Sequence, residues 1–325
     1  MAEPLPRHLL IPFAGRGSPA CRAALPSLRL PNLESLLSRL SIVQTDTQDE
    51  STRSPPHERA LAAALGIAAA DGCIPWAALE ARQLGIAEPG DSEGWGLVSL
   101  CNWQVGIDDV VLGDPAAIEI DPAESAALLA AAHPFFEEDG IALHPCATPG
   151  RWLARARIFN GLATASIDRA VGHPISQWSP LAEAARPLRR LQNEMQMLLY
   201  TQRVNDDRAA RGVPPINSFW LSGTGALQGD MLSPATPPSV QPTVSDALRV
   251  AALRDDGPGW AQAWQALDAG AIATLLADYT AGADIVLTLC GDRAAQRYAV
   301  QQRGLVGWAK SLFDRPRVAN VLEAL

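Results

Sequence analysis

The sequence has a single lysine, Lys310, so arginine supplies nearly all the positive charge of this 325-residue chain. Acidic residues outnumber basic ones, and the net charge is −9. A surface this acidic disfavours nucleic acid and anionic membranes, so the composition predicts neither as a partner. The scarcity of lysine is typical of codon bias; the alternative interpretation is a preference for bidentate anion binding by arginine.

Cysteine is also scarce, with five residues and no CxxC pair. An odd number of widely spaced cysteines excludes a disulfide framework or a zinc ribbon of ordinary spacing. The chain has no basic segment followed by an apolar leader, and no uncharged apolar run of 18 residues. These absences predict a cytoplasmic protein in a reducing compartment.

What the chain does have is enough apolar sequence for a sizeable core, because 48% of its residues are hydrophobic and 19% are charged. Residues 8–13 predict a short buried strand, and two glycines follow it. A helix comes next, with an apolar face made of Leu33, Leu36, Leu37 and Leu40. A second buried strand is predicted at 283–292. Strand, glycine loop and helix in this order predict an α/β core sheet flanked by helices.

Between these core segments, apolar periodicity predicts further elements. Residues 44–56 are polar and predict a long loop or a domain boundary, and a proline-rich loop is expected at 233–243. The tail after residue 292 is predicted to be helical. Further helices are expected at 57–65, 75–84, 122–132, 187–203, 246–254, 259–268 and 271–280, and strands at 97–101, 109–112 and 151–159.

The stretch "INSFWLSGTG" (216–225) predicts an apolar strand followed by a glycine-rich loop. The loop lacks the GK[ST] ending of a P-loop and the spacing of GxGxxG, so it either cradles an anion or only turns the chain. Arg208 and Arg211 lie just upstream. Arginine forks bind phosphate or carboxylate in a bidentate way, and exposed backbone N–H groups bind the same anions. The alternative for both arginines is a solvated helix end paired with Asp206 and Asp207.

A polar segment at 163–178 brings together Ser166, Asp168, Arg169 and His173. It lacks the GxSxG elbow that positions a catalytic serine, so catalysis by Ser166 is disfavoured. The five histidines form no HxH or HExxH pattern, and the sequence predicts no metal site.

Four collinear stretches resemble the archaeal-type cofactor-independent phosphoglycerate mutases of the alkaline phosphatase superfamily. The longest is "TQRVNDDRAARGVPPINSFWLSGTGA", and the others are "ASIDRAVGHPI", "LPNLESLLSRL" and "SLCNW". The chain is most similar to the bacterial regulatory proteins of the RpfE type. The resemblance implies an alkaline-phosphatase-like α/β core, residues 1–44 and 216–325, with an inserted α+β cap domain at 45–215.

The chain departs from that family at its chemical positions. Phe13-Ala14-Gly15 stands where the enzymes carry a metal-binding Asp-Gly, and Ser222 stands where they carry an arginine. The place of the nucleophilic serine reads His57-Glu58, with only Ser54 nearby, and Asp292 follows the final strand without a histidine. Two-metal phosphoryl transfer needs carboxylates to hold the cations. The departures therefore predict lost metal ligands and a lost nucleophile.

The sequence thus predicts a catalytically degenerate mutase-like protein with a regulatory or small-anion-binding role and no cofactor. Two alternatives stay open: an active mutase or phosphatase with an atypical site that uses Mn or Zn, and a purely structural interaction protein. The expected ligand is a small phosphorylated or carboxylated molecule. Its predicted binding residues are Asn205, Arg208, Arg211, Asn217, Ser222, Gly223, Thr224 and Gly225, with possible cap-side contacts from Asp168, Arg169 and His173.

Overall fold

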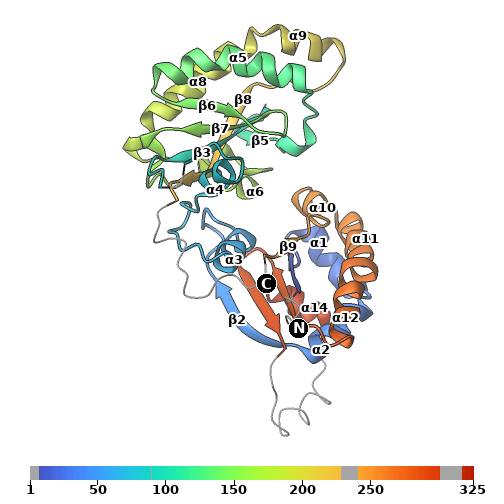
Figure 1. Cartoon of the computed structure of the whole chain (residues 1–325). Coiled ribbons are helices and arrows are strands. Elements are labelled where there is room, and N and C mark those ends of the chain that lie inside the picture. Colours follow the sequence, from blue (N-terminus) through green and yellow to red (C-terminus); the bar gives the residue numbers. More distant parts are fainter. Residues whose placement is uncertain (1–6, 89, 228–240, 301–316) are drawn as a thin grey trace. The chain divides into compact units, whose positions relative to one another are not determined.

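The computed structural model describes residues 7–88, 90–227, 241–300 and 317–325, and these divide into two compact units. The core unit contains residues 1–51, 55–67 and 234–325, and the inserted unit contains 52–54 and 68–233. Each unit has its own sheet and its own helices (Figure 1). No helix in the described ranges is long and apolar enough to cross a membrane. The predicted α/β class with an inserted second unit is confirmed.

The core unit is built on a mixed five-stranded sheet in the order β2-β11-β10-β1-β9. Strand β1 runs parallel to its neighbours β10 and β9, and β11 runs antiparallel to β10 and β2. The strands are β1 (Arg7–Ile11), β2 (Ser41–Thr47), β9 (Thr243–Val244), β10 (Ile285–Cys290) and β11 (Ala294–Ala299).

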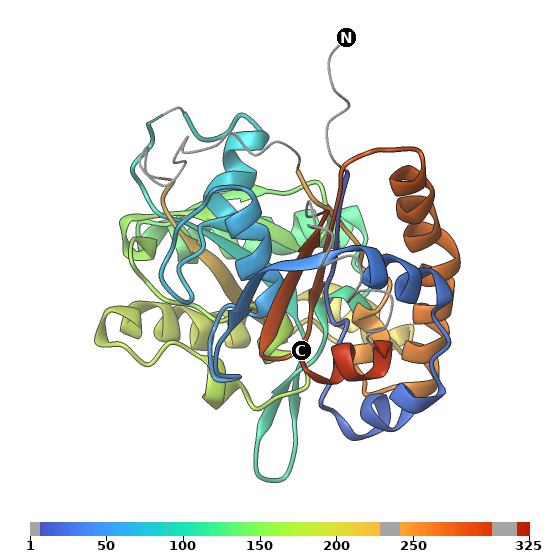
Figure 2. The ribbon, with the colours of Figure 1, turned by 90° about the horizontal axis from the view of Figure 1, so that it is seen from below.

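Helices cover the two faces of this sheet unequally. The larger apolar core lies on the face that carries Leu9, Ile11 and Leu287, and helices from both ends of the chain pack there (Figure 2). Among the described helices, only α3 (Pro56–Ala64) lies over the opposite face, next to Leu10 and Cys290. The helices of the larger core are α1 (Pro19–Ala24), α2 (Pro31–Arg39), α10 (Arg249–Leu253), α11 (Gly257–Leu267), α12 (Ala273–Thr280) and α14 (Val318–Glu323).

Helix α2 shows why the leucine pattern folds as predicted. Leu33, Leu36 and Leu37 are buried on one face, and Pro31 occupies the first turn, where its missing N–H costs nothing. The buried carboxylate of Asp268 accepts hydrogen bonds from the backbone N–H groups of Asn32 and Leu33. A distant residue therefore provides the cap that the N-terminal neighbour, Leu30, cannot.

The inserted unit carries a four-stranded antiparallel sheet in the order β6-β7-β3-β8 and a separate hairpin of β4 and β5. Helices α5 and α8 pack on one face of the sheet, and α4 packs on the other. The strands are β3 (Trp95–Cys101), β4 (Trp103–Val105), β5 (Val110–Leu112), β6 (Ala142–Pro145), β7 (Arg151–Arg155) and β8 (Ser218–Gly225). The helices are α4 (Trp76–Gln83), α5 (Pro122–Glu138), α6 (Ile167–Ala170), α7 (Ile175–Trp178), α8 (Arg186–Tyr200) and α9 (Arg203–Ala210).

Both domain boundaries lie elsewhere than the sequence suggested. Strand β8, expected to open the second part of the core, pairs along its length with β3 in the inserted unit. Helix α3, expected in the insertion, packs on the core sheet. The cause is the same in both cases, because strand pairing and helix docking depend on partners far away in the sequence.

Two local predictions also need correction. Residues 44–47 belong to the edge strand β2, not to a loop, and the tail contains strand β11 before its helix α14. Strand β2 is mostly exposed, so it lacks the apolar alternation of a half-buried strand. The proline-rich loop expected at 233–243 falls mainly outside the described residues.

Candidate functional site

The predicted anion-binding arginines hold a carboxylate that belongs to the chain itself. Arg208 is 1% exposed, and its Nη1 donates to Glu124 Oε2 at 2.8 Å and to the Glu119 carbonyl at 2.8 Å. Arg211 forms an ion pair with the other oxygen of Glu124. Glu124 also accepts from the backbone N–H of Asp121, completing a capping box at the start of α5. The two arginines thus link the end of α9 to the start of α5 through Glu124.

A pocket of about 310 Å³ lies beside this cluster and is lined by both arginines. Its lining also includes Glu119, Asp121 and Glu124, so carboxylates outnumber guanidinium groups around it. A second anion entering this pocket would meet repulsion from three acidic residues at close range. The electrostatics therefore disfavour the small-anion site predicted around Arg208 and Arg211.

The two predicted asparagines act as backbone clamps. Asn205 accepts from the Ile216 N–H at 2.8 Å and donates to the Ile216 carbonyl at 2.7 Å, so its amide mimics a strand neighbour. Asn217 makes the same pair of bonds with Trp103, at 2.7 and 2.9 Å. The Asn205 amide also donates to the Leu199 carbonyl at 2.8 Å, so both side chains bond only main-chain groups and fix the segment before β8.

Ser222, Gly223, Thr224 and Gly225 form the end of strand β8, so the predicted glycine-rich loop is wrong. Strand β3 pairs Leu97 with Ser222 and Trp95 with Gly225, so Gly223 and Thr224 lie opposite one residue, in a β-bulge. Gly223 has φ 61°, and an added Cβ would lie 3.0 Å from the Trp76 Cβ of α4. Thr224 is fully buried and donates to the Leu162 carbonyl at 2.5 Å. A covered strand end cannot offer the open ring of N–H groups that an anion requires.

The predicted residues consequently do not form one site. Asn205, Arg208 and Arg211 lie on or next to α9, whereas Gly225 ends the eight-residue strand that begins after Asn217. Eight residues of extended chain span about 26 Å. Asp168 and Arg169 lie on the short helix α6, where Arg169 donates to Thr52 at 3.2 Å, and the His173 carbonyl accepts from Leu112.

The carboxyl ends of β1 and β10 are where an α/β sheet normally binds a ligand. The chain leaves β1 through Phe13, which has φ 57°, a left-handed conformation that costs about 1–2 kcal/mol for a bulky residue. The strained turn is held because Trp260 donates its indole N–H to the Phe13 carbonyl at 3.0 Å. The Phe13 ring lies 5.1 Å from the His57 ring at a tilt of 42°, and the Arg16 guanidinium lies over the Phe13 ring at 5.8 Å.

Asp292, two residues after the end of β10, is the carboxylate that the sequence resemblance singled out near this edge. One oxygen forms an ion pair with Arg16, and the other accepts from the backbone N–H of Gly17 at 2.7 Å. A metal would have to displace an arginine from this carboxylate. No three His, Cys, Asp or Glu side chains among the described residues are grouped as metal ligands. This donor set does not fit the cation pair that a two-metal enzyme requires.

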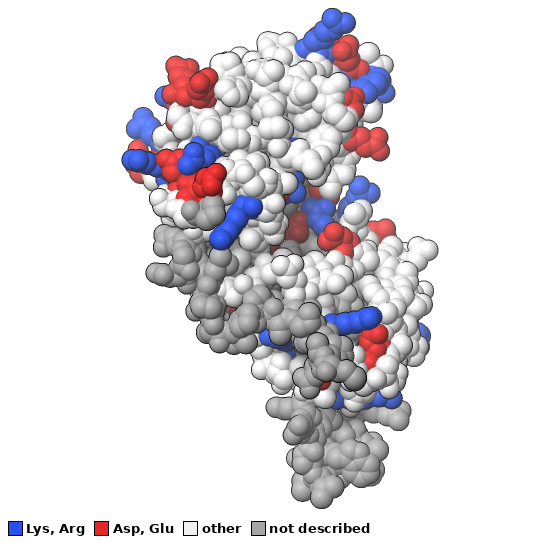
Figure 3. Space-filling model, in the orientation of Figure 1, with Lys and Arg blue, Asp and Glu red and all other residues white. Residues whose placement is uncertain are grey.

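Charges elsewhere follow no single sign. On the face drawn in Figure 3, blue and red side chains of the inserted unit alternate among white ones, and neither colour forms a continuous patch. Most of the arginines that the structure describes have an acidic neighbour, such as Arg155 with Asp91 at 3.1 Å. In that pair, hydrogen bonding to Arg155 lowers the pKa of Asp91 although burial acts in the opposite direction.

Comparison with solved structures gives matches that include the two described below. Neither a protein-family model nor a curated protein matches the chain. A cofactor-independent phosphoglycerate mutase from Thermoplasma acidophilum DSM 1728 is 14% identical, with 98% of each chain covered and a TM-score of 0.36. The PH0037 protein from Pyrococcus horikoshii is 14% identical, with 91% of this chain and 88% of that one covered and a TM-score of 0.40. Matches with TM-scores below 0.5 assign no chemistry to this chain.

Proposed function

We propose that the chain is a catalytically degenerate phosphoglycerate mutase-like protein that acts by binding, in a regulatory or small-anion-binding role. The supporting observation is that both oxygens of the Asp292 carboxylate already have partners in the chain, because one pairs with Arg16 and the other accepts from the Gly17 N–H. Phosphoryl transfer through two metals needs such carboxylates free to hold cations. The collinear sequence motifs give the proposal its mutase-like scaffold.

The residues that follow β1 support the same conclusion. In the resembling enzymes, the segment after the first strand carries a metal-binding Asp-Gly, but here it reads Phe13-Ala14-Gly15, and the Phe13 ring lies close to both His57 and Arg16. The proposal puts the protein in the cytoplasm, with a small molecule and not nucleic acid or a membrane as its partner, in keeping with the net charge of −9. The ligand is expected to be phosphorylated or carboxylated.

Metal analysis and turnover together test the loss of catalysis. Purified full-length protein is dialysed with Mn²⁺ or Zn²⁺, washed, and analysed for bound metal and for turnover of 3-phosphoglycerate. We expect less than stoichiometric metal and no turnover above the buffer rate. Stoichiometric metal with turnover that a chelator abolishes would establish the active, atypical enzyme instead.

A thermal-shift screen separates the binding role from the purely structural alternative. Phosphometabolites and carboxylates are tested with and without Mn²⁺. A saturable shift with at least one anion supports the binding role, because a ligand that binds only the folded state raises its stability by mass action. A flat response to every anion would favour an interaction protein without a ligand.

A further inference from the structure

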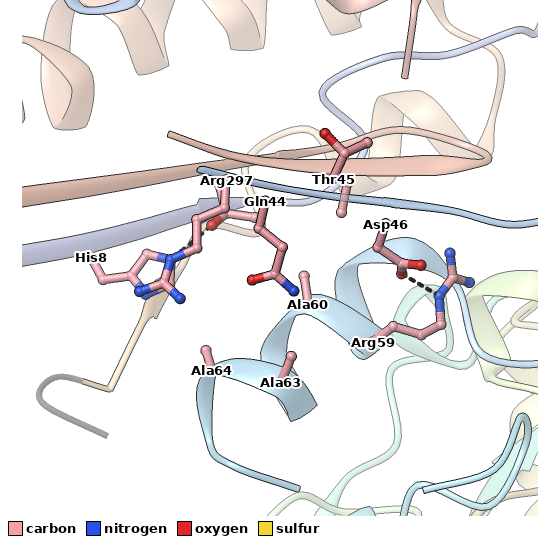
Figure 4. Close-up of a pocket in the computed structure, with 11 residues that line it drawn as sticks. His8, Gln44, Thr45, Asp46, Arg59, Ala60, Ala63, Ala64 and Arg297 are labelled. Carbon is pink, nitrogen blue, oxygen red and sulfur yellow. Dashed lines mark hydrogen bonds and ion pairs between the residues drawn. The ribbon is translucent and has the colours of Figure 1, made fainter. Parts of the chain in front are cut away.

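A pocket of about 240 Å³ lies between the core sheet and α3, on the face of the sheet that α3 covers. Its floor consists of side chains from four strands, among them His8 on β1, Thr288 on β10 and Arg297 on β11. Gln44 of β2 projects into the same space (Figure 4). The wall from α3 consists of Ala60, Ala63 and Ala64. The opening between helix and sheet exists because these three helix residues are alanines.

Arg297 is the unusual group in this pocket. Its Nε is buried, and no described residue provides a hydrogen-bond partner for it. A buried donor without a partner destabilises the folded state, and more so when it is charged. Folded proteins seldom keep such a group unless a ligand, water or ion satisfies it. The contrast with Arg59 is direct, since Arg59 Nε donates to Asp46 at 2.6 Å on the other side of the same pocket.

The remaining polar groups suit an anion bound to this guanidinium. His8 is 6% exposed, and its Nε2 lies 2.8 Å from the Thr288 hydroxyl. Burial, and secondly the charge of Arg297, lower the pKa of His8 to about 4, so the imidazole is neutral at pH 7. Because Arg59 and Asp46 cancel, the pocket keeps one net positive charge, that of Arg297. One monovalent anion neutralises it, whereas a phosphate dianion leaves an excess negative charge in a partly buried space.

We propose that this pocket binds a small organic monocarboxylate, with the carboxylate on Arg297 and Gln44 and the apolar part against the alanines of α3. A cavity of roughly 150 Å³ in another protein holds benzene, so this pocket has room for a chain of about six to ten non-hydrogen atoms. This ligand site rests on the proposed function, because it presupposes that the protein acts by binding a small anion. It assigns the ligand to a place that the sequence motifs did not indicate.

The test is titration of the full-length protein with hexanoate at pH 7, followed by calorimetry and by NMR of the His8 ring. Acetate, inorganic phosphate and hexylamine serve as comparison probes. We expect hexanoate to bind more tightly than acetate or phosphate, hexylamine not to bind, and the His8 resonances to shift during the titration. Arg297→Gln should weaken hexanoate binding at least tenfold. Arg39→Gln, which removes the same charge from an exposed position on α2, should leave binding unchanged.

Ala64→Leu provides a second test that keeps every charge. It fills the pocket from the helix side and should also weaken hexanoate binding, even if Arg297→Gln does not fold. The proposal is overturned if hexanoate leaves His8 unshifted, if phosphate binds as tightly as hexanoate, or if Arg297→Gln binds like the parent. These outcomes are independent of metal content and 3-phosphoglycerate turnover, so failure here and failure of the proposed function can be told apart.

Discussion

Two arginine clusters, one in each unit, use the same side chain in opposite ways. In the inserted unit, Arg208 and Arg211 are satisfied by Glu124, and the buried ion pair joins α9 to α5. In the core unit, Arg297 lines a pocket with its buried Nε unsatisfied by any described residue. An arginine followed by a glycine-rich segment predicts anion binding, but the anion can be supplied by the chain. Where the chain supplies none, a ligand is the remaining candidate.

The largest expected effect is on the satisfied cluster. Glu124→Gln leaves Arg208 buried without its counter-charge and should lower the free energy of unfolding by about 3–5 kcal/mol. Urea unfolding followed by circular dichroism measures this. The matched control is Arg211→Gln, whose side chain is 53% exposed and whose loss should cost less than about 1 kcal/mol. Equal costs for the two variants would mean that burial does not distinguish the members of this cluster.

A smaller effect is expected from acid at His8. The pKa of His8 is lowered to about 4 in the folded protein from 6.5 in the unfolded chain, so only the unfolded state takes up a proton as the pH falls below 6.5. The protein is therefore most stable, as far as His8 is concerned, above pH 6.5. As the pH falls toward 4, this stability is lost, and the loss at pH 5 is about 2 kcal/mol. Urea midpoints at pH 7 and pH 5 measure the loss, which His8→Gln should reduce by that amount. An unchanged pH dependence in His8→Gln would contradict it.

Gly223→Ala tests whether the "SGTG" segment is structural. The left-handed φ and the nearby Trp76 Cβ should together cost about 1–2 kcal/mol, measured as a lower thermal midpoint. Gly212→Ala is a suitable comparison, because Gly212 is also left-handed but has open space around its Cα. The Gly223 variant should therefore be the less stable of the two. If it gains stability, the bulge described for β8 is incorrect.

The smallest effect on stability is expected from Arg297→Gln, which breaks no ion pair that the structure describes. We expect a change within about 1 kcal/mol, together with a rise in the pKa of His8, because the arginine charge helps to lower it. The rise should be partial, since burial is the larger cause. An NMR titration of the His8 ring checks the direction. A further fall in the pKa would contradict the electrostatic environment assigned to this pocket.

Sequence patterns predicted the elements whose stabilising contacts are local or strongly periodic. The leucines of α2 and the buried strand β10 were found for that reason. Strand β2 was missed because its exposed side chains give no periodic signal, and β11 was missed because an alanine-rich strand resembles a helix. The roles of Asn205 and Asn217 depend on backbone partners at Ile216 and Trp103, which no spacing rule identifies.

The candidate pocket could not be read from the sequence at all. Its lining comes from the first strand, the edge strand, α3 and the last two strands, and no two of these segments form a motif. The only local signal was the alanine content of α3, which is equally typical of an ordinary helix. The sequence prediction of a ligand site around Arg208 has the opposite limitation, since the motif was present but the acidic partner of Arg208 is 84 residues away in the sequence.

The pairing of β1 with β10 has a consequence for how the protein is made. His8 and Thr288, which meet across these strands, are 280 residues apart, so the ribosome completes the inserted unit long before the core sheet can close. Until then, the apolar residues of β1 lack the strand that pairs with them, and we expect this segment to remain unfolded. A nascent chain stopped before β10 should yield a protease-resistant fragment from the inserted unit and a digested amino-terminal segment.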